Sequence, residues 1–288
     1  MIGIDWGTTS FRAVRLQGQA VIDRRDLPLG ILRVPPGGFA SALHDAVAPW
    51  LAAGETRILV SGMAGSRQGW QEAPYLPCPA DAAALAAALK PVPFDAAQVF
   101  LVPGLSVPGD PPEVMRGEET QLVGTLASIG RDGLACLPGS HSKWARIVGG
   151  SIAGFSTHLT GEAFAALRDH TILGRMVQPG AEPDPACFDM GVARSAQPGG
   201  LLHHLFGVRT LGLFDRLPNP ESYLSGLLIG HEIHAAAPGS QTVHLIGEPK
   251  LCALYARAIA GCGSSAIIVT EDAAAAGLAL IGEHAAWT

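Results

Sequence analysis

One local pattern occurs twice in this chain, and the repeat constrains the fold more than any other feature. Residues 12–27, RAVRLQGQAVIDRRDL, are typical of a β-strand, a glycine-bearing turn and a second strand. Residues 144–159, WARIVGGSIAGFSTHL, have the same form, with a double glycine at the turn. Each pair follows a short strand and a loop of small residues. The sequence therefore predicts two similar subdomains, each opening with three strands.

Strand and helix patterns then alternate in both halves. In the first half we expect strands at 2–5, 11–16, 20–26, 57–60 and 98–102, and helices at 39–53, 81–90 and 113–129. In the second half we expect strands at 134–137, 142–148, 151–157, 243–246 and 266–270, and helices at 161–176, within 190–217, and at 220–237, 248–260 and 271–286. The duplicated order βββαβαβα predicts an α/β fold of two lobes, residues 1–131 and 132–288, with a ligand cleft between them.

Composition limits the partners. A chain of 288 residues that is 48% hydrophobic can bury a large core, while its net charge of -6 argues against a nucleic-acid partner. It contains no run of about 18 apolar residues and begins directly with a strand pattern, so we expect a cytoplasmic protein without a membrane partner. The P-loop signature GxxxxGK[ST] is absent from the sequence. Small molecules are the expected ligands.

The first hairpin loop has the composition of a phosphate-binding turn. It follows the strand that ends at Asp5 and is formed by Gly7, Thr8, Thr9 and Ser10. Glycine lets backbone N–H groups approach an anion, and the hydroxyls add donors. Asp5, at the end of a buried strand, could hold a hydrated Mg²⁺. An ordinary hairpin in which Asp5 accepts hydrogen bonds from turn amides explains the same residues equally well.

A second loop of similar design stands at the matching place in the repeat. It is formed by Gly139, Ser140, His141 and Ser142, and Lys143 follows it. Two such loops could hold a polyphosphate from both sides, which is the interpretation that the repeat favours. A polar turn with a surface lysine remains the alternative.

At this point the sequence resembles a known family. The duplicated order, the segment IGIDWGTTS and the late segment VHLIGEPKLCALYARAI resemble the sugar kinase, Hsp70 and actin superfamily, whose fold is the two-lobed actin-like ATPase (ribonuclease H-like) fold. Within it, MRGEETQLVG, LPGSHSKW and FSTHLTGEAF resemble the 2-keto-3-deoxygalactonate kinases (2-dehydro-3-deoxygalactonokinases) over nearly the whole chain.

The resemblance implies an ATP-dependent phosphorylation of the C6 hydroxyl of 2-dehydro-3-deoxy-D-galactonate in galactonate catabolism, with ATP and Mg²⁺ as cofactors. It also implies a carboxylate base at the start of the helix between the lobes, which is Glu119 by preference or Glu118. Both acids could instead only complement the dipole of that helix. Glu162, which opens another helix, is a third candidate and a further residue for contact with the substrate.

Other roles follow from the same resemblance. The carboxylate of the substrate needs a cation, and the candidates are Arg116, Lys143 and Arg12. The nucleotide could pack on the turn at Gly247 and Glu248, although the usual double glycine is reduced to one. The second loop has His141 where many superfamily members have an acid, so His141 either donates to a ligand or is structural.

Three functions stay open at the level of the sequence. The first is the sugar-acid kinase, acting as a monomer or homodimer. The second is a kinase for another sugar acid or polyol on the same fold. The third is a non-kinase ATP-dependent binding protein, for which the chain lacks a long inserted partner domain.

Overall fold

A computed structural model describes residues 1–177, 180–270 and 272–287. Its contacts divide the chain into two compact units. Unit 1 contains residues 1–132, 146–155 and 270–288, and unit 2 contains 133–145 and 156–269, the undescribed positions excepted. The split into lobes at residue 131 that the sequence suggests stays a prediction.

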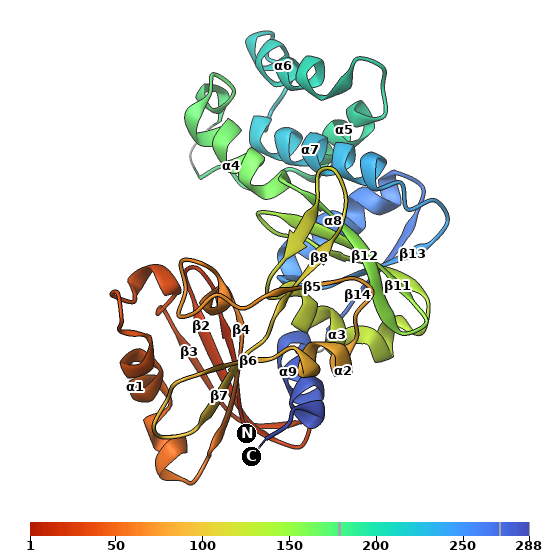
Figure 1. Cartoon of the computed structure of the whole chain (residues 1–288). Coiled ribbons are helices and arrows are strands. Elements are labelled where there is room, and N and C mark those ends of the chain that lie inside the picture. The colour runs from red at the N-terminus through yellow and green to blue at the C-terminus, as the bar shows by residue number, and fades with distance from the viewer. Residues whose placement is uncertain (178–179, 271, 288) are drawn as a thin grey trace. The chain divides into compact units, whose positions relative to one another are not determined.

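A six-stranded mixed sheet forms the centre of unit 1 (Figure 1). Its order is β3-β2-β1-β4-β7-β6. The strands are β1 (Ile2–Trp6), β2 (Phe11–Gln17), β3 (Ala20–Leu27), β4 (Arg57–Gly62), β6 (Lys90–Val92) and β7 (Gln98–Leu101). The first three form an antiparallel meander, and β1, β4 and β7 are parallel, which confirms the strands predicted in this half.

Alternation along β1 sends its side chains to two different helices. Ile2, Ile4 and Trp6 enter a core shared with α1 (Phe39–Ala52). Gly3 lies against α9 (Ala273–His284), where an added Cβ would stand 3.1 Å from Leu278. Asp5 shares the α9 face with Gly3, because residues two apart point the same way.

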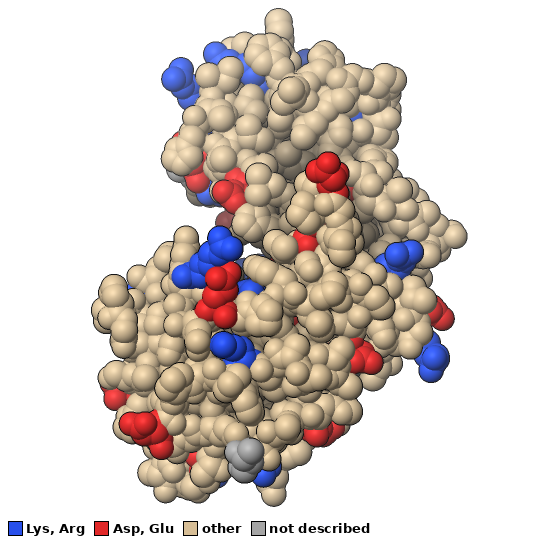
Figure 2. Space-filling model, in the orientation of Figure 1, with Lys and Arg blue, Asp and Glu red and all other residues tan. Residues whose placement is uncertain are grey.

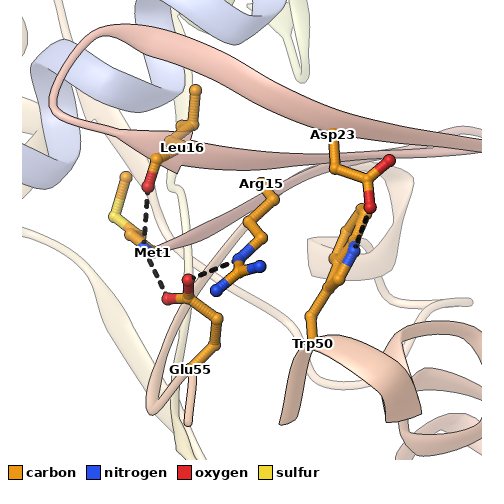
Figure 3. Close-up of polar contacts among 6 residues, drawn as sticks. All are labelled: Met1, Arg15, Leu16, Asp23, Trp50 and Glu55. Carbon is orange, nitrogen blue, oxygen red and sulfur yellow. Dashed lines mark hydrogen bonds and ion pairs between the residues drawn. The ribbon is translucent and has the colours of Figure 1, made fainter. Parts of the chain in front are cut away.

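The first residue of the chain is held in place by an ion-pair group (Figure 3). The Met1 ammonium donates to the Leu16 carbonyl at 3.0 Å and to the Glu55 carboxylate at 2.7 Å, and Arg15 Nε donates to the same carboxylate at 2.8 Å. Burial alone would raise the pKa of Glu55, but the hydrogen bonds and charges of its two partners lower it. The start of β1 is therefore tied to the sheet.

The second sheet repeats the order of the first. It reads β12-β11-β10-β13-β14, so an antiparallel meander is again followed by parallel neighbours. Its strands are β10 (Gly133–Leu137), β11 (Ser142–Val148), β12 (Ser151–His158), β13 (Thr242–Leu245) and β14 (Ser265–Ile268). The duplication predicted from the two glycine-bearing hairpins is confirmed.

Unit 2 also contains several helices. These are α4 (Thr160–His170), α5 (Pro185–Ser195), α6 (Gly200–Leu213), α7 (Pro220–Ala236) and α8 (Pro249–Gly261). Phe188 of α5, Ile229 of α7 and Tyr255 of α8 pack with Trp144 of β11 in one core. Helices α5 and α7 approach closely at Gly226, where an added Cβ would meet the Phe188 carbonyl at 2.0 Å.

The predicted helix at 113–129 is wrong in its first part. Residues Glu113–Met115 form strand β9 of a three-stranded sheet with β8 (Gly104–Val107) and β5 (Tyr75–Pro77), which the sequence did not indicate. Helix α3 begins only at Glu118 and ends at Ile129, since Gly117 before it has φ +108° and cannot continue a helix.

Three other helices are shorter or divided. Helix α2 is Ala82–Ala87 and not 81–90, because Lys90 starts β6. Helix α4 ends at His170, before a separate 3₁₀ turn Gly174–Met176. The helical stretch at 190–217 is interrupted after Ser195 by Pro198 and by Gly199 at φ +127°. The predicted start of the last helix, residue 271, lies outside the described residues.

No helix in the described ranges combines the length and the apolar character that a membrane crossing requires.

Candidate active site

Asp5 stands at the carboxyl end of β1 in acidic surroundings. Its nearest cation is the guanidinium of Arg12, whose Nη1 lies 3.9 Å from Oδ2. Burial raises the pKa of Asp5, Arg12 lowers it, and the carboxylates of Glu118 and Asp272 raise it further. Negative charge thus collects beside β1, and a cation bound there would stabilise it.

The first loop uses its own backbone to hold its shape. The Gly7 N–H donates to the Ser10 carbonyl at 2.9 Å, which closes the turn. Gly30 passes beneath the loop, where a Cβ would stand 2.2 Å from the Thr8 carbonyl oxygen. The side chains of Thr8 and Thr9 remain exposed. These two residues are therefore accessible to an anion, whereas the N–H of Gly7 is already engaged.

Glu119 is the second residue of α3 and is fully buried. Its Oε2 accepts from the Gly117 N–H at 2.7 Å, and its Oε1 lies 3.2 Å from the Thr120 hydroxyl and 3.5 Å from that of Ser61. Burial, reinforced by the neighbouring charge of Glu118, raises the pKa of Glu119 to about 8. At neutral pH this carboxyl is mainly protonated and out of reach of solvent.

Glu118, the first residue of α3, has the opposite environment. It is partly exposed, and its Oε2 accepts from the Arg116 N–H at 3.1 Å. Its charge raises the pKa of both Asp5 and Glu119. Of the two adjacent acids, Glu118 is thus the one that an incoming group can contact.

The guanidinium of Arg116 lies in the interior of the protein and is only partly hydrogen-bonded within the described residues. The residue is 8% exposed, its Nη2 donates to the Ala73 carbonyl at 2.8 Å, and its Cζ lies 4.4 Å from the centre of the Tyr75 ring. Within the described part of the chain, Nε and Nη1 are buried and have no hydrogen-bond partner, and neither has the Ser66 hydroxyl. Such donors are costly to leave unpaired, so they favour a bound anion.

The second loop is supported by the start of α4. The Glu162 N–H donates to the Ser140 carbonyl at 3.0 Å, and an added Cβ on Gly161 would stand 2.5 Å from the Gly139 carbonyl oxygen. The half-exposed side chains of His141 and Glu162 are hydrogen-bonded, with Nε2 and Oε2 2.5 Å apart. His141 and Glu162, predicted separately, are thus brought together.

Two other predicted residues of this loop point into the protein. Ser142 is buried, and its hydroxyl lies 2.8 Å from the Tyr255 hydroxyl. Lys143 is buried as well, and its Nζ donates to the His141 carbonyl at 2.9 Å. Their direct contact with phosphate and substrate stays a prediction.

Unit 2 contains a pocket of about 780 Å³ with mainly apolar walls. Its wall includes Gly139, Ser140, Gly161, Phe164, Phe188 and Tyr255. Glu248 caps α8 by accepting from the Leu251 N–H at 2.7 Å, and Leu251 in turn lines the pocket. Gly247 and Glu248 do not line it themselves, but they begin the helix that does.

The comparisons with known proteins agree with one another. A model of the 2-keto-3-deoxy-galactonokinase family matches residues 5–281. A Rhizobium meliloti (strain 1021) protein named "Probable 2-dehydro-3-deoxygalactonokinase DgoK1" is 37% identical over 286 residues, covering 94% of this chain and 92% of the relative. The 2-dehydro-3-deoxygalactonokinase of Escherichia coli (strain K12) is 33% identical over 279 residues, covering 95% and 94%.

The chain belongs to the 2-keto-3-deoxy-galactonokinase family. It is therefore an ATP-dependent kinase, as its resemblance to that family implied.

A solved structure supports the fold of this kinase. A crystal structure of a Sinorhizobium meliloti protein, assigned provisionally to the same family, has a TM-score of 0.89 at 35% identity and covers 98% of this chain and 95% of that one. An activator of 2-hydroxyisocaproyl-CoA dehydratase from Clostridium difficile, solved with bound ADPNP, has a TM-score of 0.51 at 12% identity, with 98% and 94% covered. The latter likeness concerns the fold alone. The predicted actin-like ATPase fold is confirmed.

Sequence analysis of this kinase missed several residues of both sites. Ser61 and Thr120, whose hydroxyls lie 2.7 Å apart beside Glu119, come from β4 and α3. Tyr255 and Glu232 stand behind the second loop, on α8 and α7. A polar residue in the buried part of a strand, as Ser61 is after ILV in RILVSG, was the available signal for the first pair.

The surface of the kinase shows no broad basic area on the face drawn in Figure 2, where lysine and arginine are scattered among acids. The predicted lack of a nucleic-acid partner remains a prediction.

Proposed function

We propose that this protein transfers the γ-phosphoryl group of ATP to the C6 hydroxyl of 2-dehydro-3-deoxy-D-galactonate, in galactonate catabolism in the cytoplasm. The observation that supports this most strongly is the family match over residues 5–281, which includes both loops and the MRGEETQ segment. Phosphoryl transfer depends on positioning and charge neutralisation more than on covalent chemistry.

We assign the nucleotide to the pocket of unit 2. Mainly apolar walls suit an adenine ring, and the loop residues Gly139 and Ser140 in the pocket wall suit phosphate oxygens. The packing of α4 on this loop supports the assignment, because a loop that is already fixed loses little conformational entropy when it binds phosphate.

We assign the general base to Glu118. A base must come within hydrogen-bond distance of the hydroxyl that it deprotonates, and Glu118 is accessible where Glu119 is not. Glu119 then has a different role: its carboxyl accepts from the Gly117 N–H and stabilises the turn that presents Glu118.

We assign the carboxylate of the sugar acid to Arg116. Two unpaired donors on one buried guanidinium match the two oxygens of a carboxylate. Ser66, whose hydroxyl also lacks a partner among the described residues, follows Gly65, where an added Cβ would stand 2.8 Å from Arg116 Nη1. Arg12 is exposed beside Asp5 and serves as a second cation near the substrate. The buried position of Lys143 favours support of the second loop through the His141 carbonyl.

Asp5 would hold Mg²⁺ through water. The charge that Asp5, Glu118 and Asp272 concentrate fits a hard cation. The described ranges contain no group of three or more His, Cys, Asp or Glu side chains that could hold a metal ion. Mg²⁺ usually binds only one or two carboxylates and keeps water molecules and substrate phosphate oxygens as its other ligands. When bound, the ion would neutralise negative charge on the phosphates.

The test is a coupled assay of ADP release. Purified protein with ATP, Mg²⁺ and 2-dehydro-3-deoxygalactonate should release ADP well above the rate without sugar acid, and the product should carry phosphate at C6. The C4 epimer of the substrate and a simple polyol are the comparisons. Faster turnover with either of these would reassign the substrate, and no stimulation by any of them would refute the kinase proposal.

A further inference from the structure

A continuous chain of buried hydrogen bonds stands behind the second loop of unit 2. Trp144 Nε1 on β11 donates to Glu232 Oε1 on α7 at 2.7 Å. The Tyr255 hydroxyl on α8 donates to Glu232 Oε2 at 2.7 Å and lies 2.8 Å from the Ser142 hydroxyl. All four residues are buried.

The direction of these bonds follows from the number of hydrogens. Tyr255 gives its single hydroxyl hydrogen to Glu232 Oε2. The Tyr255 oxygen can then accept from Ser142 at 2.8 Å, and the Ser142 hydroxyl also lies 3.5 Å from the Gly139 carbonyl oxygen, its second possible acceptor. Ser142, the last residue of the loop and the first residue of β11, ends this chain of donors.

The carboxylate at the centre of this chain has neutral partners on both oxygens. A buried carboxylate whose partners are removed is strongly unfavourable, so Trp144 and Tyr255 must stay in place for Glu232 to be tolerated. The hydroxyl of Ser142 is consequently held at one position. Burial also raises the pKa of Tyr255, which keeps its hydroxyl protonated and able to donate.

The chain of bonds adjoins the pocket. Tyr255 lines the pocket together with Gly139 and Ser140, which precede Ser142 by three and two residues, respectively. A shift of Ser142 would move the loop backbone that faces the pocket. Glu232 itself is not among the lining residues, so it can act there only through Tyr255 and Ser142.

We propose that Glu232, through Tyr255 and Ser142, is a positioning group that fixes the second loop for the phosphates of the nucleotide. The proposal rests on the assignment of the nucleotide to this pocket. It changes the expected role of Ser142 from a phosphate ligand to the anchor of the loop that binds phosphate.

Tyr255→Phe is the most direct test, since it removes one hydroxyl and keeps the ring. We expect KM for ATP and Kd for ADP to rise about tenfold, the size of one lost hydrogen bond, with KM for the sugar acid unchanged. Tyr223→Phe is the matched control, because Tyr223 is also buried in unit 2 but lies outside the chain of bonds. The control should leave both KM values unchanged.

Ser142→Ala provides a second variant in case Tyr255→Phe does not fold. It should raise KM for ATP by a similar factor, and the double variant should be no worse than either single one, because both remove the same bond. Equal rises in both KM values, an additive double variant, or a lower Tm with unchanged ADP binding would each overturn the proposal.

Calorimetry with ADP separates this inference from the proposed function. A wild-type protein that binds no ADP, or that releases none with any sugar acid, would refute the kinase assignment. A wild-type protein that binds ADP normally, with variants that bind it equally well, would refute only the positioning role.

Discussion

The two loops occupy the same place in two sheets of the same order, yet they are built differently. The first follows Asp5, is closed by its own backbone and lies on Gly30. The second follows the apolar residues Cys136 and Leu137 and is supported by α4 and by a buried chain of side chains. Repetition of the sheet thus preserved the position of the loop and not its chemistry. Charge is concentrated beside the first loop, and an apolar pocket adjoins the second.

Of the variants that test this difference between the two loops, Glu118→Gln should have the largest effect on kcat. Loss of a general base should lower kcat by about 100- to 1,000-fold with little change in either KM, since the base acts in the transition state. Steady-state kinetics with ATP and sugar acid would measure it. Glu113→Gln, which changes an acid on β9 just before the site, is the control. Normal activity of Glu118→Gln together with a large loss of activity in Glu119→Gln would show that the buried Glu119 is the base.

Asp5→Asn should come next, with kcat lowered about 30-fold and the Mg²⁺ concentration for half-maximal rate increased. The amide keeps the shape of the side chain but removes the charge that attracts the cation. Rate measured against Mg²⁺ concentration is the readout. An unchanged Mg²⁺ dependence would contradict the metal role and leave Asp5 as a residue of the hairpin.

Arg116→Lys should raise KM for the sugar acid about tenfold and leave KM for ATP unchanged, because lysine keeps the charge but loses the two-pronged donor geometry. Arg67→Lys, on an exposed arginine paired with Glu72, is the control. A variant with an equal rise in both KM values would show a structural role for Arg116.

Glu119→Gln should have the smallest effect on turnover and a distinct effect on stability. The pKa of Glu119 is raised from 4.5 to about 8 by folding. The stability linked to its bound proton is therefore complete below about pH 4.5 and is lost as the pH rises toward 8, by up to about 1.4 kcal/mol per pH unit. Urea unfolding at pH 6, 7 and 8 should show this decline in the wild type and a weaker one in the variant. Parallel declines would mean that Glu119 is ionised in the folded protein.

Short strands and distant partners limited what could be predicted. The glycine-bearing hairpins identified both sheets, because alternation and turn residues are local signals. The strands Tyr75–Pro77 and Glu113–Met115 were missed, because three residues are too few to show an alternating pattern. Each of these two strands pairs with β8. Gly117, which separates β9 from α3, has a positive φ that glycine readily adopts, and an added Cβ there would stand 3.4 Å from Gly62 Cα.

The sequence by itself determined the family, the duplicated order of strands, the two loops and the set of acids from which a base must come. Tertiary structure decided which of those groups are accessible. Glu119 is buried because Ser61, 58 residues before it, lies against it, and Ser142 faces Tyr255, 113 residues away. The solvent access and the pKa of a side chain depend on residues that are distant in the sequence, because the packing of the fold decides which residues become its neighbours. The sequence therefore favoured Glu119 as the base, whereas its burial in the folded protein favours the partly exposed Glu118.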